Sequence, residues 1–345
     1  MDGAYMQNRK VDIAVIGAGI AGLSFARAIQ QHGSEVLIVE RSRALGGRCA
    51  TWRHGETPLD YGVPFLHGRS PLFWQTVDEL MGEDVLSGWP QRVEGNGPTC
   101  QPHALDPGVR HAAVRGGLNT LAKKLATGIQ ILRESEVTST TIRDGFIELK
   151  GGHFSVTAKT LVLAAANGES LRLLKNSGFS KETAAAMALF GLAPALPGFS
   201  LLVCYDTPFS RPAWELLLPD DSQAIQLISN ESSKSAPLQE LCLCIQSRPA
   251  WSRKYLEAPA DVWSRELLRE SQPYLGDWAL RPDWQRPHRW LEARLDSASR
   301  LRRPLLQVID GCQLGVTGEY FDQAGGLEGA FLSGQRLATL IMEAL

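Results

Sequence analysis

Residues 11–48 read VDIAVIGAGIAGLSFARAIQQHGSEVLIVERSRALGGR. An apolar segment leads into Gly17-x-Gly19-x-x-Gly22, a helical pattern follows, and a second apolar segment ends at Glu40. Gly17 permits a tight turn, Gly19 leaves room for a pyrophosphate, and Gly22 lets the helix pack closely on the sheet. Free N–H groups at the start of the helix attract phosphate, and a carboxylate at Glu40 accepts hydrogen bonds from ribose hydroxyls. The stretch therefore predicts a dinucleotide-binding βαβ unit.

Composition indicates an ordinary globular enzyme. The chain has 345 residues, of which 44% are hydrophobic and 21% charged, and its formal net charge is −2. Such a balance favours neither nucleic acid nor an anionic membrane surface as a partner. The first ten residues are too short and polar for a signal peptide, and no apolar run reaches the roughly 18 residues of a membrane span. We expect a cytoplasmic protein.

Cysteine and histidine spacing argues against redox and metal chemistry. The six cysteines are scattered without a C-x-x-C pair, so we expect buried free thiols in a reducing cytosol. Cys242 and Cys244 share one face of a strand-like run, and we assign them no redox role. The seven histidines show no metal-ligand spacing, so no metal site is predicted.

Further motifs resemble one superfamily. Gly46-Gly47-Arg48-x-x-Thr51 resembles the GGR-x-x-T signature of the flavin-containing amine oxidases and phytoene desaturases, and Asp60-Tyr61-Gly62 matches the D-x-G that follows it. Gly116-Gly117-Leu118 resembles the family's GG segment, and Gly318-Glu319 matches its C-terminal G-[DE]. The segment from Pro287 to Ala293, which contains His288-Arg289-Trp290, resembles the HRW-x-x-A stretch of renalase-like oxidoreductases. Trp52 and Pro64 depart from the pattern of that subgroup, so the substrate is expected to differ from that of renalase itself.

The resemblance implies a fold and a domain organisation. We expect an α/β protein with a discontinuous Rossmann-like FAD-binding domain and an inserted α+β substrate domain on a mixed or antiparallel sheet. The FAD-binding domain is expected at residues 1–70, 107–178 and 304–345, and the substrate domain at residues 71–106 and 179–303. Six of the nine tryptophans fall in the second of these insertions, where most are expected to pack in a core.

The same resemblance implies noncovalent FAD and a set of residues that bind it. These are Gly17, Gly19, Ile20, Ala21, Gly22, Glu40, Arg41, Gly46, Gly47, Arg48, Asp60, Tyr61, Gly62, Val137, Gly318, Glu319, Gly326, Leu327 and Gly329. The backbone of Val137 falls where the adenine is usually contacted, and Glu319 where the ribityl chain is bound. The helix opened by Gly326 is expected to point its N-terminus at the N1–C2=O edge of the flavin, where negative charge accumulates on reduction.

The chemistry implied is the transfer of a hydride from a small organic donor to flavin N5. A hydride-rich donor, such as a reduced or isomeric dihydronicotinamide dinucleotide, needs no side-chain base. Because residues 160–167 lack a second G-x-G-x-x-G, dioxygen is the expected acceptor, with hydrogen peroxide as product. No catalytic residue is certain, and the candidates near the flavin are His67, His288, Trp290 and Tyr320.

Two other functions stay open. One is an amine oxidase or a desaturase acting on a small amine or an apolar substrate. Amine oxidases often have a lysine that holds a water at N5 and an aromatic pair opposite it, and neither can be placed in this sequence. The other is a noncatalytic carrier on the same fold, resembling Rab GDP-dissociation inhibitors. Retention of Glu40 and Gly318-Glu319 argues against the carrier.

Overall fold

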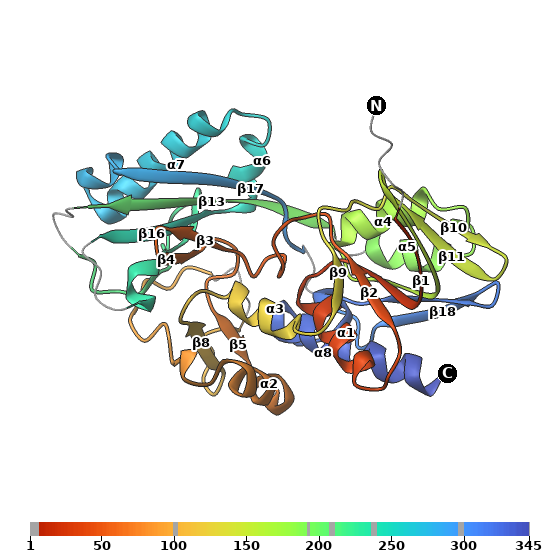
Figure 1. Cartoon of the computed structure of the whole chain (residues 1–345). Coiled ribbons are helices and arrows are strands. Elements are labelled where there is room, and N and C mark those ends of the chain that lie inside the picture. Colours follow the sequence, from red (N-terminus) through yellow and green to blue (C-terminus); the bar gives the residue numbers. More distant parts are fainter. Residues whose placement is uncertain are drawn as a thin grey trace. The chain divides into compact units, whose positions relative to one another are not determined.

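The computed structural model describes residues 7–98, 103–191, 194–206, 211–235, 240–295 and 300–344. The chain divides into two compact units (Figure 1). Unit 1 comprises Met1–Gly47, Ala122–Pro194 and Leu295–Leu345, and unit 2 comprises Arg48–Leu121 and Ala195–Arg294. The domain bounds expected from the sequence stay a prediction.

Unit 1 is built on an eight-stranded sheet with the order β10-β11-β12-β1-β2-β9, to which β19 adds beside β12 and β18 beside β19. The strands are β1 (Gln7–Ile16), β2 (Val36–Val39), β9 (Gln130–Leu132), β10 (Ser139–Arg143), β11 (Phe146–Lys150), β12 (Phe154–Leu163), β18 (Leu305–Ile309) and β19 (Cys312–Val316). The helices are α1 (Ile20–Gln30), α4 (Asn167–Lys175), α5 (Ala184–Gly191), η4 (Glu319–Phe321) and α8 (Gly326–Glu343), and α3 (Asn119–Leu125) leads in from unit 2.

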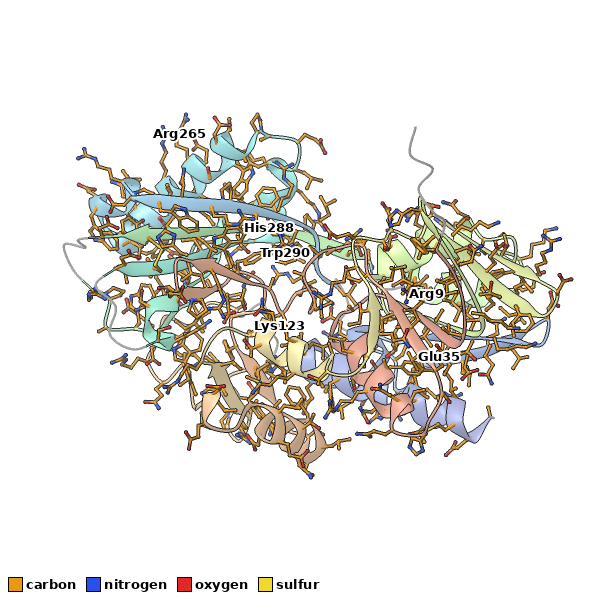
Figure 2. The ribbon with its side chains drawn as sticks, viewed as in Figure 1. Arg9, Glu35, Lys123, Arg265, His288 and Trp290 are labelled. Carbon is orange, nitrogen blue, oxygen red and sulfur yellow. A yellow bond between two sulfur atoms is a disulfide. The ribbon has the colours of Figure 1, made fainter. Side chains whose placement is uncertain are left out.

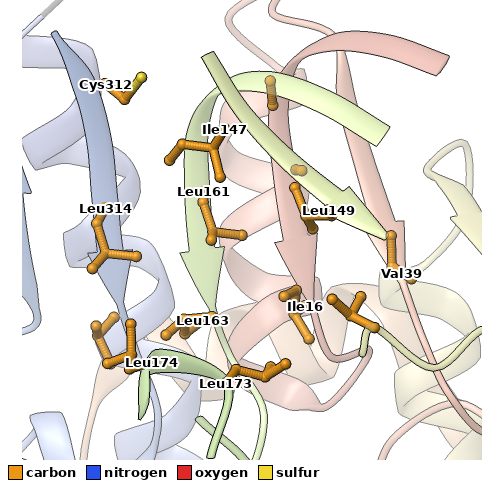
Figure 3. Packing of buried hydrophobic residues seen from close by; sticks show 14 of the residues in the cluster. Ile16, Val39, Ile147, Leu149, Leu161, Leu163, Leu173, Leu174, Cys312 and Leu314 are labelled. Atoms are coloured by element: carbon orange, nitrogen blue, oxygen red, sulfur yellow. The ribbon is translucent and has the colours of Figure 1, made fainter. Parts of the chain in front are cut away.

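The sheet is parallel from β19 through β12, β1 and β2 to the edge strand β9, and antiparallel strands lie on its other sides. β1 runs parallel to both β12 and β2, and β19 runs parallel to β12, whereas β11 and β18 turn back as antiparallel partners. Central parallel strands are covered on both faces, which explains the apolar runs at residues 13–16 of β1 and 161–163 of β12. Ile16, Leu163 and Leu314 lie together in the resulting core (Figure 3).

Helices α1 and α8 cross closely in unit 1. A Cβ added at Gly334 of α8 would collide with the carbonyl oxygen of Ala21 in α1. The Ser24 hydroxyl of α1 donates a hydrogen bond to the carbonyl oxygen of Phe331 in α8 at 2.8 Å. The C-terminal helix is thereby fixed beside the helix that follows the glycine-rich turn.

Unit 2 is built on a six-stranded mixed sheet with the order β17-β13-β16-β15-β14-β7, a three-stranded sheet β5-β8-β6 and the hairpin β3-β4. The strands are β3 (Thr51–His54), β4 (Thr57–Asp60), β5 (Leu66–Gly68), β6 (Val85–Ser87), β7 (Val93–Glu94), β8 (Arg110–Val114), β13 (Ala195–Tyr205), β14 (Leu216–Leu217), β15 (Ile225–Asn230), β16 (Leu241–Ser247) and β17 (Trp284–Leu295). The helices are α2 (Pro71–Met81), η1 (Gly82–Asp84), η2 (Glu231–Lys234), α6 (Pro249–Lys254), α7 (Ala260–Leu275) and η3 (Asp277–Leu280).

The large sheet of unit 2 has a tryptophan-rich core. Trp214, Trp251 and Trp263 are buried among the aliphatic side chains of β13, β15 and β16, as the sequence predicts. Trp290 lies elsewhere, on β17. The α/β class, the Rossmann-like first part and the mixed second sheet expected from the sequence are confirmed. Within the described ranges, no helix has both the length and the apolarity needed to cross a bilayer.

The cysteine expectation needs one correction. Cys204 of β13 and Cys242 of β16 form a disulfide, because the antiparallel register places them directly opposite each other with 4.2 Å between their Cα atoms. They are 38 residues apart in sequence, so spacing alone cannot reveal the pair. Cys49, Cys244 and Cys312 are buried free thiols as expected, and Cys100 lies outside the described residues.

Candidate cofactor site

The glycine-rich turn has the shape that a bound pyrophosphate requires. Gly17 has φ +107° and donates its N–H to the Val39 carbonyl at 3.0 Å. A Cβ at Gly22 would collide with the Gly17 carbonyl oxygen, whereas a Cβ at Gly19 would meet nothing within 4 Å. Position 22 therefore has no room for a side chain, whereas the space beside Gly19 can hold a ligand. The first N–H groups of α1, which begins with Ile20 and Ala21, have no partner inside the helix.

Glu40 holds the turn from the tip of β2. Its Oε2 accepts the N–H of Ala18 at 2.8 Å, and its Oε1 accepts the N–H of Ser42 at 2.8 Å. Each carboxylate oxygen can accept a second hydrogen bond, so the half-buried side chain remains able to bind a diol. The exposed Arg41 lies 4.0 Å from the partly buried Glu169. Val137 is buried in the core of unit 1.

The Gly46-Gly47 doublet joins the glycine-rich turn. The N–H of Gly46 donates to the Ala18 carbonyl at 2.9 Å, and Gly46 forms an isolated bridge with Gly19. Both glycines have positive φ, 104° at Gly46 and 56° at Gly47, a conformation that glycine adopts readily. Two motifs that are separate in the sequence thus form one continuous backbone surface in unit 1.

The C-terminal motif is organised by Ser333. Its hydroxyl contacts both the N–H and the carbonyl of Gly318, at 3.1 and 2.9 Å. Glu319 follows at the start of η4, and α8 begins at Gly326, which like Gly325 before it has a positive φ. Leu327 is buried, and the N–H of Gly329 donates to the Gly325 carbonyl at 2.7 Å.

Arg300 was not singled out by the sequence. Its Nη1 donates to the carbonyl oxygen of Glu319 at 3.2 Å, and a Cβ added at Gly325 would collide with its guanidinium. A fixed cation therefore lies against the N-terminus of α8, where the positive end of the helix dipole already favours negative charge. No motif surrounds this arginine, so only the fold could reveal it.

In unit 2, three further motif segments meet at one carboxylate. Asp60 Oδ1 accepts the Thr51 hydroxyl at 2.6 Å and the Leu118 N–H at 2.9 Å. Arg48 donates through Nη1 to the Ala293 carbonyl at 3.3 Å. Only glycine fits at position 62, because a Cβ there would collide with the Arg48 carbonyl oxygen. The GGR-x-x-T, D-x-G and GG segments are therefore one connected structure.

The other oxygen of Asp60 belongs to a buried ion cluster. Lys234 Nζ lies 3.0 Å from Asp60 Oδ2, 2.9 Å from Glu231 Oε2 and 2.7 Å from the Pro64 carbonyl oxygen. Burial raises the pKa of Glu231, although Lys234 opposes that shift. Burial alone would lower the pKa of Lys234, but Asp60 and Glu231 together raise it above its ordinary value. Lys234 therefore stays an ammonium ion.

Three of the predicted residues form an aromatic cluster, with His288 and Trp290 on β17 and Tyr61 directly after β4. Tyr61 stacks on Trp290 with 5.4 Å between ring centroids, and His288 contacts both rings at 4.9 and 4.2 Å. The Trp290 indole N–H donates to the Tyr61 carbonyl at 3.2 Å and to the Ser200 hydroxyl at 3.1 Å. Figure 2 shows His288 and Trp290 along the same strand. We call Tyr61, His288 and Trp290 the β17 aromatic cluster.

A cation accompanies this cluster. The Arg286 guanidinium lies 3.5 Å from the centroid of the Trp52 ring, and its buried Nε has no hydrogen-bond partner among the described residues. Burial lowers the pKa of His288 to about 4, and Arg286 adds to that shift. Burial raises the pKa of Tyr61, whereas Arg286 lowers it. At neutral pH the cluster therefore combines uncharged rings with one fixed positive charge.

The two remaining candidates are buried. His67 of β5 is 6% exposed and faces His111 across the sheet, and its Nε2 has no hydrogen-bond partner among the described residues. Burial lowers the pKa of His67 to about 4, with His111 adding to the effect. Tyr320 lies in the core of unit 1, where its ring contacts Phe321.

Comparison with known families agrees with this geometry. Residues 15–80 match the model of the NAD(P)-binding Rossmann-like domain, and residues 93–342 match that of the flavin-containing amine oxidoreductases. The second match covers well over half of the chain. This chain belongs to the flavin-containing amine oxidoreductase family.

Individual relatives of this chain are distant in sequence. A proposed flavin-containing monoamine oxidase, AofH, of Mycobacterium tuberculosis is 45% identical over 56 residues, which are 16% of this chain and 12% of AofH. The chain thus spans a small part of that relative's length. A proposed protoporphyrinogen oxidase from Exiguobacterium has a TM-score of 0.76 at 12% identity, covering 99% of this chain and 100% of that one. Putrescine oxidase bound to putrescine has a TM-score of 0.69 at 14% identity, covering 97% and 100%. These structures share the fold.

The residues of this chain fit the flavin cofactor that its family implies. The open space at Gly19 leaves room for a phosphate, and the two carboxylate oxygens of Glu40 can accept hydrogen bonds from a diol. The guanidinium of Arg300 suits an electron-rich ring edge. Sequence reasoning missed Glu231, Lys234 and Arg300. The first two lie in a short 3-10 helix, and no spacing in the sequence relates them to Asp60.

Proposed function

We propose that this chain is an FAD-dependent oxidase whose donor is a reduced or isomeric dihydronicotinamide dinucleotide. Noncovalent FAD would accept the hydride at N5 and pass the electrons to dioxygen, giving hydrogen peroxide. The donor is a small molecule that carries a flat ring and a negatively charged pyrophosphate. The protein's part is to bind both molecules, to orient the donor and to stabilise charge.

The β17 aromatic cluster and Arg286 carry the proposal. Flat aromatic faces suit a planar donor ring, and the fixed guanidinium suits an anion. The neutral imidazole of His288 can exchange a hydrogen bond with a carboxamide without adding charge. An ammonium substrate would instead be repelled by Arg286, which has no carboxylate in contact among the interactions of the described residues.

The cofactor-binding residues have separate proposed tasks. Gly17, Gly19 and Gly22, with the N-terminus of α1, would bind the pyrophosphate, and Glu40 would bind the ribose hydroxyls. The N-terminus of α8 and Arg300 would stabilise negative charge at the N1–C2=O edge. Gly318 and Glu319 would hold the ribityl chain, as the family resemblance implies.

An amine oxidase is the second candidate, and the names of AofH and putrescine oxidase favour it. Amine oxidases often use a lysine to hold a water at N5. Lys234 is the buried lysine of unit 2, but its three N–H groups already meet Asp60, Glu231 and the Pro64 carbonyl. A lysine with every donor in use has none left for a water. The structure therefore favours the first candidate.

Anaerobic flavin reduction tests the choice. Dihydronicotinamide dinucleotide isomers are expected to bleach the flavin within seconds, whereas putrescine and other small amines leave it oxidised. Arg286→Gln is expected to raise the KM for the dinucleotide about tenfold with less effect on kcat, because it removes one charge-assisted contact. Arg265→Gln, at an exposed position of α7, is the matched control (Figure 2). Bleaching by amines alone would overturn the proposal.

A further inference from the structure

Four side chains with metal-binding atoms converge at one end of the β13–β16 strand pair in unit 2. His54 is the last residue of β3, and Cys204 lies near the end of β13. Glu240 directly precedes β16, and Cys242 is the second residue of that strand. His54 Nε2 lies 3.7 Å from Glu240 Oε2. Donor atoms of His54, Cys204 and Glu240 all lie within 4.8 Å of one another. Cys242 Sγ lies 4.0 Å from Glu240 Oε2.

We propose that these four side chains bind one zinc ion when the Cys204–Cys242 disulfide is reduced. Two thiolates, an imidazole and a carboxylate are all ligands that zinc accepts, and four of them complete its tetrahedron. Thiolate sulfur disfavours magnesium and calcium, which require oxygen ligands. The site is independent of the proposed flavin chemistry, because none of its four residues belongs to the predicted cofactor set.

The disulfide and the metal exclude each other. In the disulfide each sulfur is bonded to the other and cannot act as a thiolate ligand. A dithiol reductant supplies two electrons, breaks the S–S bond and is itself oxidised to a disulfide, leaving two protein thiols. Zinc binding then releases one proton from each thiol, because the ligand is the thiolate. The same four residues thus have an oxidised, metal-free state and a reduced, metal-bound state.

The surroundings suit such a site. Both sulfurs are fully buried beside Leu59 and Leu202, which limits access of water to the metal–sulfur bonds. The side chains of His54 and Glu240 are 27% and 38% exposed, so an ion can enter past them. The His54 ring packs against Trp284 with 4.4 Å between centroids, which limits its rotation.

Spacing in the sequence could not have revealed these ligands. Glu240 and Cys242 are close in the chain, but His54 and Cys204 come from two distant segments. The sequence prediction of no metal site rested on local spacing. Strand pairing and the β3-β4 hairpin bring the four side chains together.

Zinc retention by the flavin-loaded full chain tests the proposal. One sample is reduced with a phosphine, a second is oxidised with diamide, and both are incubated with zinc chloride and desalted without oxygen. We expect about one zinc per chain in the reduced sample and none in the oxidised one. Cobalt(II) replaces zinc in a parallel sample, and a thiolate-to-cobalt charge-transfer band is expected only after reduction. This measurement on the wild-type chain needs no variant to fold.

Variants identify the ligands. Cys204→Ser and Cys242→Ser are each expected to weaken the cobalt band, and the Cys204→Ser/Cys242→Ser double variant is expected to abolish it. Removing an outer partner of a metal ligand already costs about 10- to 100-fold in affinity, so His54→Gln and Glu240→Gln should each weaken zinc binding at least that much. Cys244→Ser is the matched control, since Cys244 is an equally buried thiol two residues along the same strand. Circular dichroism checks that each variant is folded.

Three results would overturn the proposal. The first is a reduced wild-type chain that retains no zinc. The second is equal retention in the reduced wild type and in a folded Cys204→Ser/Cys242→Ser double variant. The third is loss of the cobalt band in Cys244→Ser with its retention in Cys242→Ser.

Discussion

Lys234 Nζ lies 3.0 Å from Oδ2 of Asp60, and both side chains are almost completely buried. The second carboxylate of the cluster, Glu231, lies 2.9 Å from the same ammonium. Because Asp60 also accepts hydrogen bonds from Thr51 and Leu118, this single cation stabilises the residue that joins three motif segments. The ion cluster thus stabilises the position of Asp60, which is one of the predicted cofactor residues in unit 2.

Lys234→Met is expected to lower the free energy of unfolding by about 3–5 kcal/mol, because it leaves two buried carboxylates without their cation. Chemical denaturation at neutral pH measures the loss. Lys123→Met, at an exposed position of α3, is the control and should stay within about 0.5 kcal/mol of the wild type (Figure 2). A Lys234→Met chain as stable as the control would show that the ion cluster does not contribute this free energy of unfolding.

Glu40→Ala is expected to lose FAD while the chain stays folded. The change removes the acceptor of the Ala18 and Ser42 N–H groups and the proposed partner of the ribose hydroxyls. Flavin absorbance against total protein measures the occupancy. Glu35→Ala is the matched control, because Glu35 is an exposed acid just before the same strand (Figure 2). Full occupancy in Glu40→Ala would refute the ribose assignment.

Arg300→Met is expected to slow anaerobic flavin reduction roughly tenfold and to make the flavin midpoint potential more negative, because a positive charge near the reduced ring is lost. Stopped-flow absorbance and dye-linked potentiometry measure the two effects. Arg302→Met, an exposed neighbour, should change neither. An unchanged potential in Arg300→Met would place the guanidinium away from the flavin.

His67 is expected to make stability depend on pH between about 4 and 6.5. Its folded-state pKa is lowered to about 4 by burial, so between these values the unfolded chain binds more protons than the folded chain. Stability is therefore lost as the pH falls from 6.5 towards 4, by up to about 3 kcal/mol.

Denaturation midpoints across this range test the effect. His67→Gln should flatten the dependence, whereas His153→Gln, at an exposed position, should leave it unchanged. Identical slopes in the wild type and His67→Gln would exclude His67 as the cause.

Much of the flavin domain could be predicted from local sequence. The turn at Gly17, Gly19 and Gly22 requires glycine for steric reasons that hold within a few residues. As expected, the structure has no room for a side chain at Gly22 and has free space beside Gly19. The side-chain partners could not be predicted in the same way. Lys234 and Arg300 belong to no sequence motif. Their roles arise because the fold places Asp60 beside Lys234 and Gly325 beside Arg300.

The sequence by itself determined the βαβ start, the order of the motifs and the family, because each depends on residue types at short, fixed spacing. Only the tertiary structure decided that Cys204 faces Cys242, that Arg286 lies over Trp52 and that His288 joins Tyr61 and Trp290. These contacts depend on strand register and on how β17 lies against the β3-β4 hairpin. Register is an outcome of packing between segments far apart in the chain, so no local pattern encodes it.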